Sequence, residues 1–380
     1  GRTRSARAEG AVLARSAVDV WVEAFRVERR GIDVRAGLAG GVATCAPVAL
    51  GVALDEPTIA VTACFGGLNA ALAVPRGALR ERVGWGSGAS LACCVSVAVG
   101  TAVQSNAGAS VLAAFALVGL AAFLRTFGPN GGLTGFVIGA IFVITNGIPA
   151  GSLDVAERVL WFALGSLGGV VLMVAAFARD APPPSPDAMP LGSALALGAR
   201  QLRQAIAGDA LLRAHALRLA SIVAATTLFY KLLDLDHGYW VPLTVLAVLQ
   251  PDEHASNVRA VQRAAGTFVG ASLIALLTIA TGAHWLIIAA QGIAAFWLFA
   301  LFARGYFWLV VLLTPTALLT VSAVDYQGDS VALQRAGWSA LGIVVGLAIA
   351  ELCWRLAPHL PGAPRGRPLA AASDDLQPER

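Results

Sequence analysis

Long apolar runs, separated by short polar turns, recur along the chain. A helix of about 20 mostly apolar residues matches a hydrocarbon core of about 30 Å. Lipid offers no hydrogen bonds to the backbone, so such runs are expected to be helices, and open sheets are excluded. The runs predict twelve spans in two series of six: 36–54, 57–74, 86–103, 107–124, 132–149 and 157–178, then 214–233, 238–256, 265–282, 284–303, 306–323 and 333–354.

A polar stretch that begins with the proline-rich run at residues 181–186 separates the two series. Proline breaks helices, and the residues after this run have the pattern of a polar, amphipathic helix around 201–206. We therefore divide the chain as follows: 1–34, a cytoplasmic amphipathic N-terminal segment; 35–178, the first six-helix transmembrane repeat; 179–212, a cytoplasmic linker; 213–356, the second six-helix repeat; and 357–380, a disordered cytoplasmic tail.

Arginine falls mainly in alternate turns between the predicted spans. It is frequent before the first span and between the second and third spans, both of which the positive-inside rule places in the cytoplasm. With twelve spans and both termini cytoplasmic, Arg158, Lys231 and Arg335 are the basic residues left outside. An odd number of spans in either half would break this agreement.

The two halves also resemble each other when the chain is shifted by about 182 places. Gly88-Ala-Ser-Leu then falls on Gly270-Ala-Ser-Leu, and the Arg76 and Arg80 pair falls near Arg259 and Arg263. Because six is even, repeats of six spans share one orientation and are related by an axis along the membrane normal. The predicted fold is an all-α integral membrane protein of about twelve transmembrane helices, in two parallel six-helix repeats.

Composition narrows the possible functions. Hydrophobic residues make up 57% of the chain and charged residues 13%, against roughly 45–50% and about 25% in soluble domains, so a solvated globule is excluded. The basic residues form no stripe with aromatic residues, and no nucleic-acid partner is expected. The five cysteines lack the spacing of a zinc site. No phosphate-binding glycine motif is present, so direct use of ATP is not expected. We predict no enzyme activity, no cofactor and no metal.

One stretch in the second series carries a distinctive pattern. Tyr239-Trp-Val-Pro242 opens a short apolar run that ends at Gln250-Pro251. A short, proline-bounded segment indicates an interrupted helix near a pathway. Arg259 and Arg263 follow, four residues apart and hence on one helical face. Glycines at 266 and 270 continue this spacing and would allow close helix approach.

At these residues the chain resembles the FUSC family, the fusaric acid resistance and aromatic acid exporter-like membrane proteins, and more distantly the plant aluminium-activated malate channels. The Tyr-Trp, the Gln-Pro and the Arg-x-x-x-Arg-x-x-Gly-Thr-x-x-Gly that follows look like the family signature, sharply over 238–273 and diffusely in the first half. The resemblance implies a homodimer in the bacterial inner membrane that exports small aromatic or otherwise hydrophobic organic acids. The linker is shorter than the cytosolic domain of the larger exporters.

Several residues are candidates for the substrate pathway. Arginines at the inner mouth would attract anions and pair with a carboxylate, and the aromatic pair could stack on a ring. Amides within spans face protein or water. The candidate set is Arg76, Arg80, Tyr239, Trp240, Pro242, Gln250, Arg259, Arg263, Thr267, Asn69, Asn146 and Gln291. Topology alone also places arginines at cytoplasmic span ends and aromatics at interfaces, and the amides could simply join helices.

The sequence leaves three functions open. The first is an exporter or channel for small organic anions, with the substrate and the lipid bilayer as partners. The second is a major facilitator transporter, which shares twelve spans and parallel halves, although the motif of the second half is unlike that superfamily. The third is a membrane scaffold or accessory subunit without transport. The energy source is also open, since the predicted spans lack deeply buried carboxylates for a proton relay.

Overall fold

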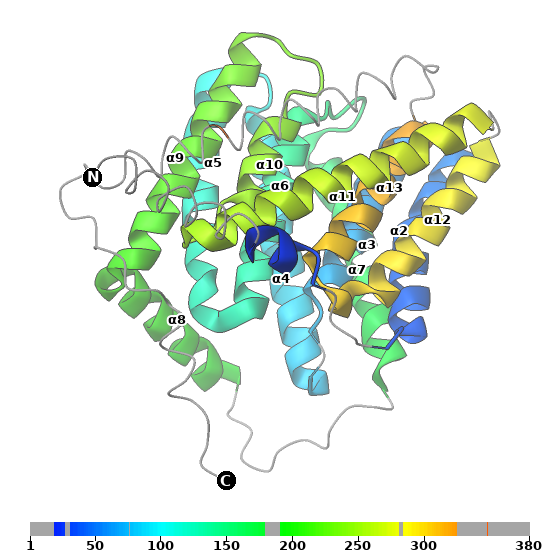
Figure 1. Ribbon diagram of the computed structural model, residues 1–380. Helices are drawn as coiled ribbons and strands as arrows, with labels where there is room; N and C mark the ends of the chain where they lie inside the picture. The colour runs from blue at the N-terminus through cyan, green and yellow to red at the C-terminus, as the bar shows by residue number, and fades with distance from the viewer. Residues whose placement is uncertain are drawn as a thin grey trace, which may run out of the picture.

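The computed structural model describes residues 19–26, 31–75, 77–178, 191–280 and 284–324, together with residue 348. This part of the chain is helical and contains no strand (Figure 1). The helices of the first half are α2 (Val34–Ala53), α3 (Pro57–Ala73), α4 (Leu79–Val103), α5 (Ala107–Ala122), α6 (Gly128–Gly147) and α7 (Val155–Ala176), with a 3₁₀ turn, η1 (Phe123–Phe127), between α5 and α6.

The linker contains helix α8 (Leu191–Gly208), and the second half follows it. The elements of the second half are α9 (Ala210–Leu232), α10 (Trp240–Val248), α11 (Glu253–Ala280), α12 (His284–Ala300), the 3₁₀ turn η3 (Phe302–Arg304) and α13 (Tyr306–Val324). The amphipathic linker helix expected around 201–206 lies within α8. The predicted span at 333–354 and the tail at 357–380 lie outside the described residues.

Five helical stretches in the described ranges are long and apolar enough to cross a membrane. They are α2, α4, the continuous stretch from α5 through α6, α7 and α9. Three shorter apolar helices, at Pro57–Ala73, Trp285–Ala300 and Tyr306–Thr320, pack among them. The chain is therefore a multi-pass membrane protein.

The predicted span over 238–256 is wrong in its extent. Helix α10 has 9 residues and stops at Val248, because Leu249 adopts an extended conformation with ψ 116. Pro251 explains the break, because a proline disfavours the helical conformation of the residue before it. A new helix, α11, then begins at Glu253, well before the predicted start at 265.

Short polar side chains begin many of these helices. The carboxylate of Asp33 accepts from the Ala36 amide at 3.0 Å at the start of α2, and Asp209 accepts from Leu212 at 2.9 Å at the start of α9. At α7, Asp154 and Glu157 form a reciprocal capping box. Such caps satisfy backbone N–H groups that have no partner within the helix.

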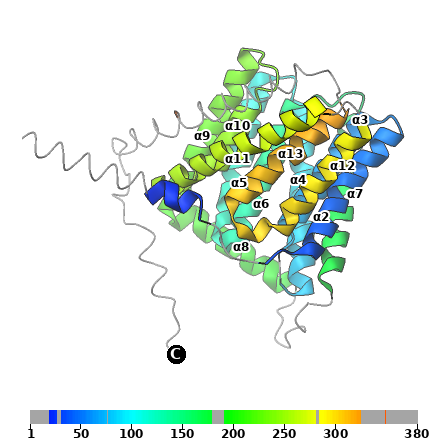
Figure 2. The ribbon, with the colours of Figure 1, turned by 45° about the vertical axis from the view of Figure 1, so that its right-hand side comes forward.

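The two halves pack against each other reciprocally. Helix α5 of the first half packs along α9 of the second, and α12 of the second packs along α2 of the first. In the same way α6 contacts α10 and α13 contacts α3. If α2 to α6 correspond in order to α9 to α13, then the α5–α9 contact corresponds to the α12–α2 contact, and the α6–α10 contact corresponds to the α13–α3 contact. Such exchange of the two halves is the pattern of a two-fold interface, and Figure 2 shows α12 of the second half beside α2 of the first.

Glycines allow several of these helices to touch closely. A Cβ at Gly266 would lie 2.8 Å from Val310 Cβ, and one at Gly270 would lie 2.8 Å from the Val311 carbonyl oxygen. The close helix approach expected at these two glycines is thus found between α11 and α13. In the first half, Gly165 does the same for α7, since its Cβ would meet the Ala63 carbonyl oxygen of α3 at 2.0 Å.

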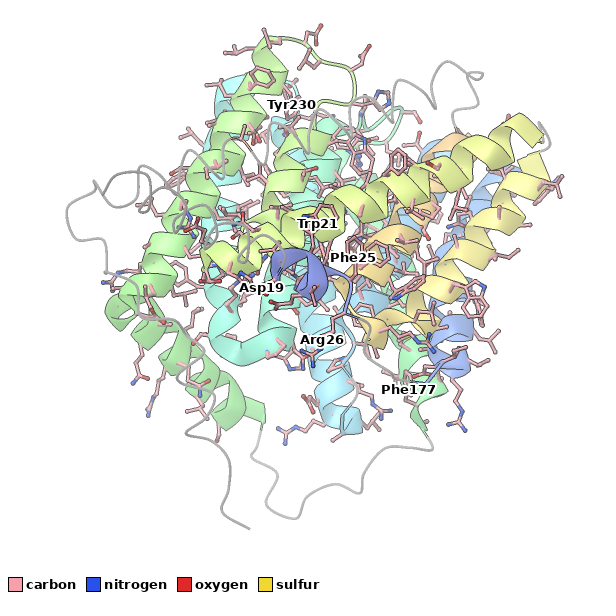
Figure 3. The ribbon with its side chains drawn as sticks, in the orientation of Figure 1. Asp19, Trp21, Phe25, Arg26, Phe177 and Tyr230 are labelled. Atoms are coloured by element: carbon pink, nitrogen blue, oxygen red, sulfur yellow. The ribbon has the colours of Figure 1, made fainter. Side chains whose placement is uncertain are left out.

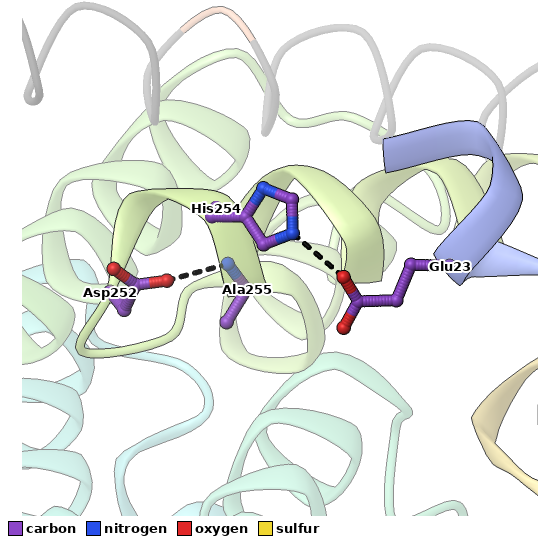
Figure 4. A network of polar contacts seen from close by, with 4 residues as sticks. All are labelled: Glu23, Asp252, His254 and Ala255. Carbon is purple, nitrogen blue, oxygen red and sulfur yellow. Dashed lines mark hydrogen bonds and ion pairs between the residues drawn. The ribbon is translucent and has the colours of Figure 1, made fainter. Parts of the chain in front are cut away.

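A short N-terminal helix at residues 19–24 lies against α11 and α13 (Figure 3). Phe25 meets Phe307 edge to face, with 5.2 Å between ring centroids. Gln262 Nε2 donates to the Ala24 carbonyl oxygen at 3.0 Å. His254 Nε2 and Glu23 Oε2 are 2.7 Å apart (Figure 4). Ala24 and Phe25 therefore fasten this segment to the protein, whereas Trp21 and Val22 are exposed.

Candidate substrate pathway

A cavity of about 70 Å³ lies between the two halves. Its walls come from α3, α6, α10, α11 and α13, which include the corresponding pairs α3 with α10 and α6 with α13. Phe136 and Ile148 both line it and are twelve residues apart, so it follows α6 for about 18 Å. The lining residues are Phe65, Leu68, Asn69, Leu72, Phe136, Ala140, Ile144, Ile148, Tyr239, Trp240, Leu243, Arg263, Leu313, Thr314 and Ala317.

Arg263 is the charged residue among these lining residues. It sits on α11, its side chain is 7% exposed, and its Nε is buried without a hydrogen-bond partner. In the described part of the chain no carboxylate or carbonyl oxygen accepts from this guanidinium. An unpaired charge in apolar surroundings is costly, by several kcal/mol. Water or an anion in the cavity would supply the missing acceptors.

Tyr239 and Trp240 form an aromatic pair at the start of α10. Their rings are stacked, with centroids 5.5 Å apart. Gly147, at the end of α6, makes room for them, because a Cβ there would lie 2.3 Å from Tyr239 Cβ. The indole Nε1 of Trp240 is buried and has no acceptor. The cavity is therefore bordered by two donor groups without partners, one on α10 and one on α11.

A second cavity of about 200 Å³ adjoins the first at the end of the bundle where α3 ends. Leu72 lines both cavities. Apolar residues of α2, α6, α7, α12 and η3 complete the second cavity, among them Phe177 and Phe299. Since α4 and α11 begin at this end and carry the clustered arginines, we call it the arginine-rich end. Leu72 thus stands between a central and an end cavity.

The structure brings four of the twelve predicted pathway residues together around the central cavity: Asn69, Tyr239, Trp240 and Arg263. Asn69 also donates from Nδ2 to the Phe65 carbonyl oxygen at 2.7 Å. These four come from both halves of the chain. Asn69 was selected as a polar side chain within a predicted span, and the other three were selected by the motif of the second half.

The other predicted arginines lie elsewhere. Arg259 stacks over the Tyr306 ring, with the guanidinium carbon 3.9 Å from the ring centroid. Arg80 is exposed at the start of α4, and Arg76 lies outside the described residues. Thr267 is buried one turn after Arg263, and its hydroxyl has no partner. Of the four arginines that were expected around the inner mouth, Arg263 is the one that lines the described cavity.

Gln250 and Pro242 take positions that shape α10. Pro242 is buried in the first turn of the helix, where a missing N–H is tolerated. Gln250 Oε1 accepts from Arg125 Nη2 at 2.6 Å, and the Gln250 carbonyl oxygen accepts from Arg218 Nη2 at 2.9 Å. These contacts fix the turn between α10 and α11.

Asn146 and Gln291 take part in contacts between helices. Asn146 Nδ2 donates to Ser110 Oγ at 2.9 Å, and its Oδ1 accepts from the Tyr230 hydroxyl at 2.9 Å. Gln291 Nε2 donates to Thr320 Oγ1 at 3.2 Å. Neither lines the central cavity. Their positions fit the reading in which amides within spans join helices.

Sequence reasoning missed the apolar lining and two further arginines. Leu72, Phe136 and Leu313 line the cavity, but an apolar side chain on a cavity and one in lipid look alike in a sequence. Arg125 and Arg218 hold Gln250, and the former follows directly after an apolar helix. An arginine at such a place could have suggested a contact with the other half.

Comparison with known proteins agrees with the second-half motif. Residues 223–349 match the family FUSC_2, described as "Fusaric acid resistance protein-like". A stretch of 56 residues is 46% identical to "Uncharacterized protein ORF2" of Neisseria gonorrhoeae, covering 15% of this chain and 13% of that protein. No solved structure matches the chain significantly. The match confirms the resemblance over residues 223–349, where this multi-pass membrane protein is similar to fusaric acid resistance protein-like (FUSC) proteins.

Proposed function

We propose that this chain transports small organic anions across the bacterial inner membrane, through the cavity between its two halves. The observation that carries the proposal is Arg263, a buried cation with no acceptor among the described residues, in a cavity whose lining is otherwise uncharged. A carboxylate would satisfy the fork of donors that the guanidinium presents. The family match over 223–349 supports transport and favours it over a major facilitator protein.

The lining supports a substrate class. One arginine suits one carboxylate, the apolar walls suit a hydrophobic body, and the Tyr239 and Trp240 pair offers an aromatic face. The substrate class is therefore aromatic or hydrophobic monocarboxylic acids. At about 70 Å³, the cavity has room for roughly five waters at about 10–15 Å³ each. Passage of a ring requires the walls to move apart, and Leu72 is the side chain between this cavity and the next.

The membrane arrangement belongs to the same proposal. Twelve spans in two parallel repeats, 35–178 and 213–356, with both termini cytoplasmic, place the arginine-rich end inside the cell, where it faces the substrate to be exported. The reciprocal packing of the halves supports the repeat. The homodimer rests on the family resemblance. Its test is the mass of the complex in mild detergent and in native membranes.

The transport test is flux of a labelled aromatic carboxylate, such as benzoate, from proteoliposomes. We expect Arg263→Gln to reduce protein-dependent flux at least tenfold, because the anion loses its one charged partner. The matched control is Arg80→Gln, since Arg80 is exposed and outside the cavity, and it should keep near wild-type flux. Equal flux in wild type and Arg263→Gln, from equally folded protein, would refute the site.

Driving forces separate the modes of transport in the same assay. Flux that accumulates substrate against its gradient when a pH gradient is imposed identifies a proton-coupled exporter. Flux that follows only the substrate gradient and the membrane potential identifies a channel. If no aromatic or aliphatic acid moves through folded protein, the scaffold function replaces transport.

A further inference from the structure

A second group of cationic side chains lies at the arginine-rich end, apart from the central cavity. Arg125 from η1 and Arg218 from α9 both donate to Gln250, in the turn before α11. Arg259 on α11 lies close enough to Arg125 for their charges to repel. We call Arg125, Arg218, Arg259 and the nearby His215 the arginine cluster. It joins the first half of the chain to the second.

His215 is the most buried member of the arginine cluster. It is 1% exposed, and neither ring nitrogen has a hydrogen-bond partner in the described part of the chain. The charges of Arg125 and Arg218 both act on it. A neutral imidazole carries one N–H donor and one acceptor nitrogen. Leaving a buried polar group unpaired costs about 1–3 kcal/mol. A ligand that formed a hydrogen bond with the His215 ring would therefore gain this energy.

Two arginines of this cluster, Arg125 and Arg259, have no carboxylate partner in the part of the chain that the structure describes. Arg125 uses a neutral acceptor, the Gln250 side-chain oxygen, and Arg259 uses the face of Tyr306. A hydrogen bond from arginine to a charged oxygen is roughly twice as strong as one to a neutral oxygen. An anion that reached Arg125 would thus compete well with Gln250.

Space for such a ligand exists beside Arg125. A cavity of about 20 Å³ lies between α5, α6, α9 and α10, with Arg125 and Leu219 in its lining. Leu219 is one turn after His215 on the same face of α9. The volume suits one water-sized group, such as a single oxygen of an oxyanion. Phe136 lines both this cavity and the central one.

We propose that the arginine cluster is an oxyanion-binding site, in which a carboxylate or phosphate oxygen replaces the Gln250 side-chain oxygen on Arg125. Arg218 and Arg259 add their positive charge, and His215 donates its N–H to the anion. Binding releases the side-chain contact between η1 of the first half and the α10–α11 turn of the second. The site is separate from Arg263 and does not depend on transport.

The ligand chemistry has two sources, a free anion in solution and the phosphate of an anionic lipid. The test uses the full chain in mild detergent, with thermal unfolding followed by tryptophan fluorescence. Sodium benzoate, inorganic phosphate and phosphatidylglycerol are titrated separately at constant ionic strength. A ligand that binds only the folded state raises the unfolding temperature in a saturable way.

We expect at least one of these ligands to stabilise the wild type, and Arg125→Gln to raise its half-saturating concentration at least tenfold. Gln250→Glu is the complementary variant, because it supplies a carboxylate beside Arg125 within the chain. It should fold at least as stably as wild type and lose the response. Arg80→Gln should keep the response to every ligand. Arg263→Gln should keep the response to phosphate and to phosphatidylglycerol, whereas benzoate can also bind Arg263 in the central cavity.

The outcomes separate the sources and can overturn the site. Saturable stabilisation by phosphate, or by benzoate in the Arg263→Gln variant, supports a site for free oxyanions, and stabilisation by phosphatidylglycerol alone supports a lipid phosphate. The proposal is refuted if none of these three responses is seen, or if they are undiminished when Arg125→Gln or Gln250→Glu is added. Loss of the phosphate response in Arg263→Gln alone would assign the binding to the central cavity and would likewise refute it.

Discussion

Three arginines are buried among the residues that the structure describes, two in the first half and one in the second. Arg82 and Arg158 are both 3% exposed, and Arg263 is 7% exposed. Arg82 donates to the Phe177 carbonyl oxygen. Arg158 donates to the carbonyl oxygens of Thr145 and Ile148, at 3.1 and 3.0 Å. Arg263 has no such acceptor.

The difference shows that burial alone does not tell what an arginine is for. Carbonyl groups at the end of a helix lack partners within it, and a cation there satisfies them and complements the helix dipole. Arg82 and Arg158 act in this way and hold helix ends in place. Arg263 is about as buried but borders a cavity instead. The acceptors around a buried charge, more than its depth, distinguish a structural residue from a candidate binding residue.

The largest effect on stability is expected from Arg158→Met. It would leave three oxygens without their donor, on Thr101, Thr145 and Ile148, at about 1–3 kcal/mol for each buried group left unpaired. We expect a loss of about 3 kcal/mol or more. SDS titration in mixed micelles, followed by circular dichroism, measures it. A loss as small as that of the exposed control Arg80→Met would remove the distinction between the two kinds of arginine.

An intermediate effect is expected from Gly147→Ala, which changes the aromatic wall opposite Arg263. The new Cβ would collide with Tyr239, and overpacking costs typically about 1–3 kcal/mol. Displacing Tyr239 should also slow flux of aromatic acids more than flux of aliphatic acids. Gly168→Ala is the matched control, because its Cβ meets nothing within 4 Å. Equal behaviour of the two variants would show that the Tyr239 position is unimportant.

The smallest effect on stability is expected from Arg263→Met. No protein hydrogen bond is lost, and replacing a buried charge with an apolar side chain of similar size is often neutral or stabilising. We expect the free energy of unfolding to stay within about 1 kcal/mol of wild type or to rise, measured in the same titration. A loss comparable to that of Arg158→Met would reveal a structural role for Arg263.

Much of the fold follows from the pattern of apolar runs. Helices α2 to α7 lie where the sequence predicts helices, because caps such as Asp154 and breakers such as prolines mark their ends. The prediction failed at α10 and α11. Hydropathy detects contact with lipid, whereas the polar first turns of α11 contact protein, including Gln262 against the N-terminal segment.

The site was predictable in part. Tyr239, Trp240 and Arg263 stand out through the motif of the second half, and Asn69 stands out as an amide within an apolar run; all four line the cavity. Asn146 has the same local signal, but its partner Tyr230 is 84 residues away in sequence, so only the packed structure shows that its amide is satisfied. The sequence could not show, for the same reason, which of the arginines between the predicted spans line the cavity.

Joining both halves in one polypeptide has a consequence for the symmetry of the cavity. Two identical subunits around a two-fold axis would each contribute the same arginine, and two guanidinium groups facing each other across a narrow apolar space would repel. Here the two halves differ: Arg263 lines the cavity, and Arg80, which falls near it when the sequence is shifted onto itself, is exposed. Because both halves belong to one chain, the cavity between them can contain a single arginine instead of a symmetric pair. One monovalent anion would neutralise that charge.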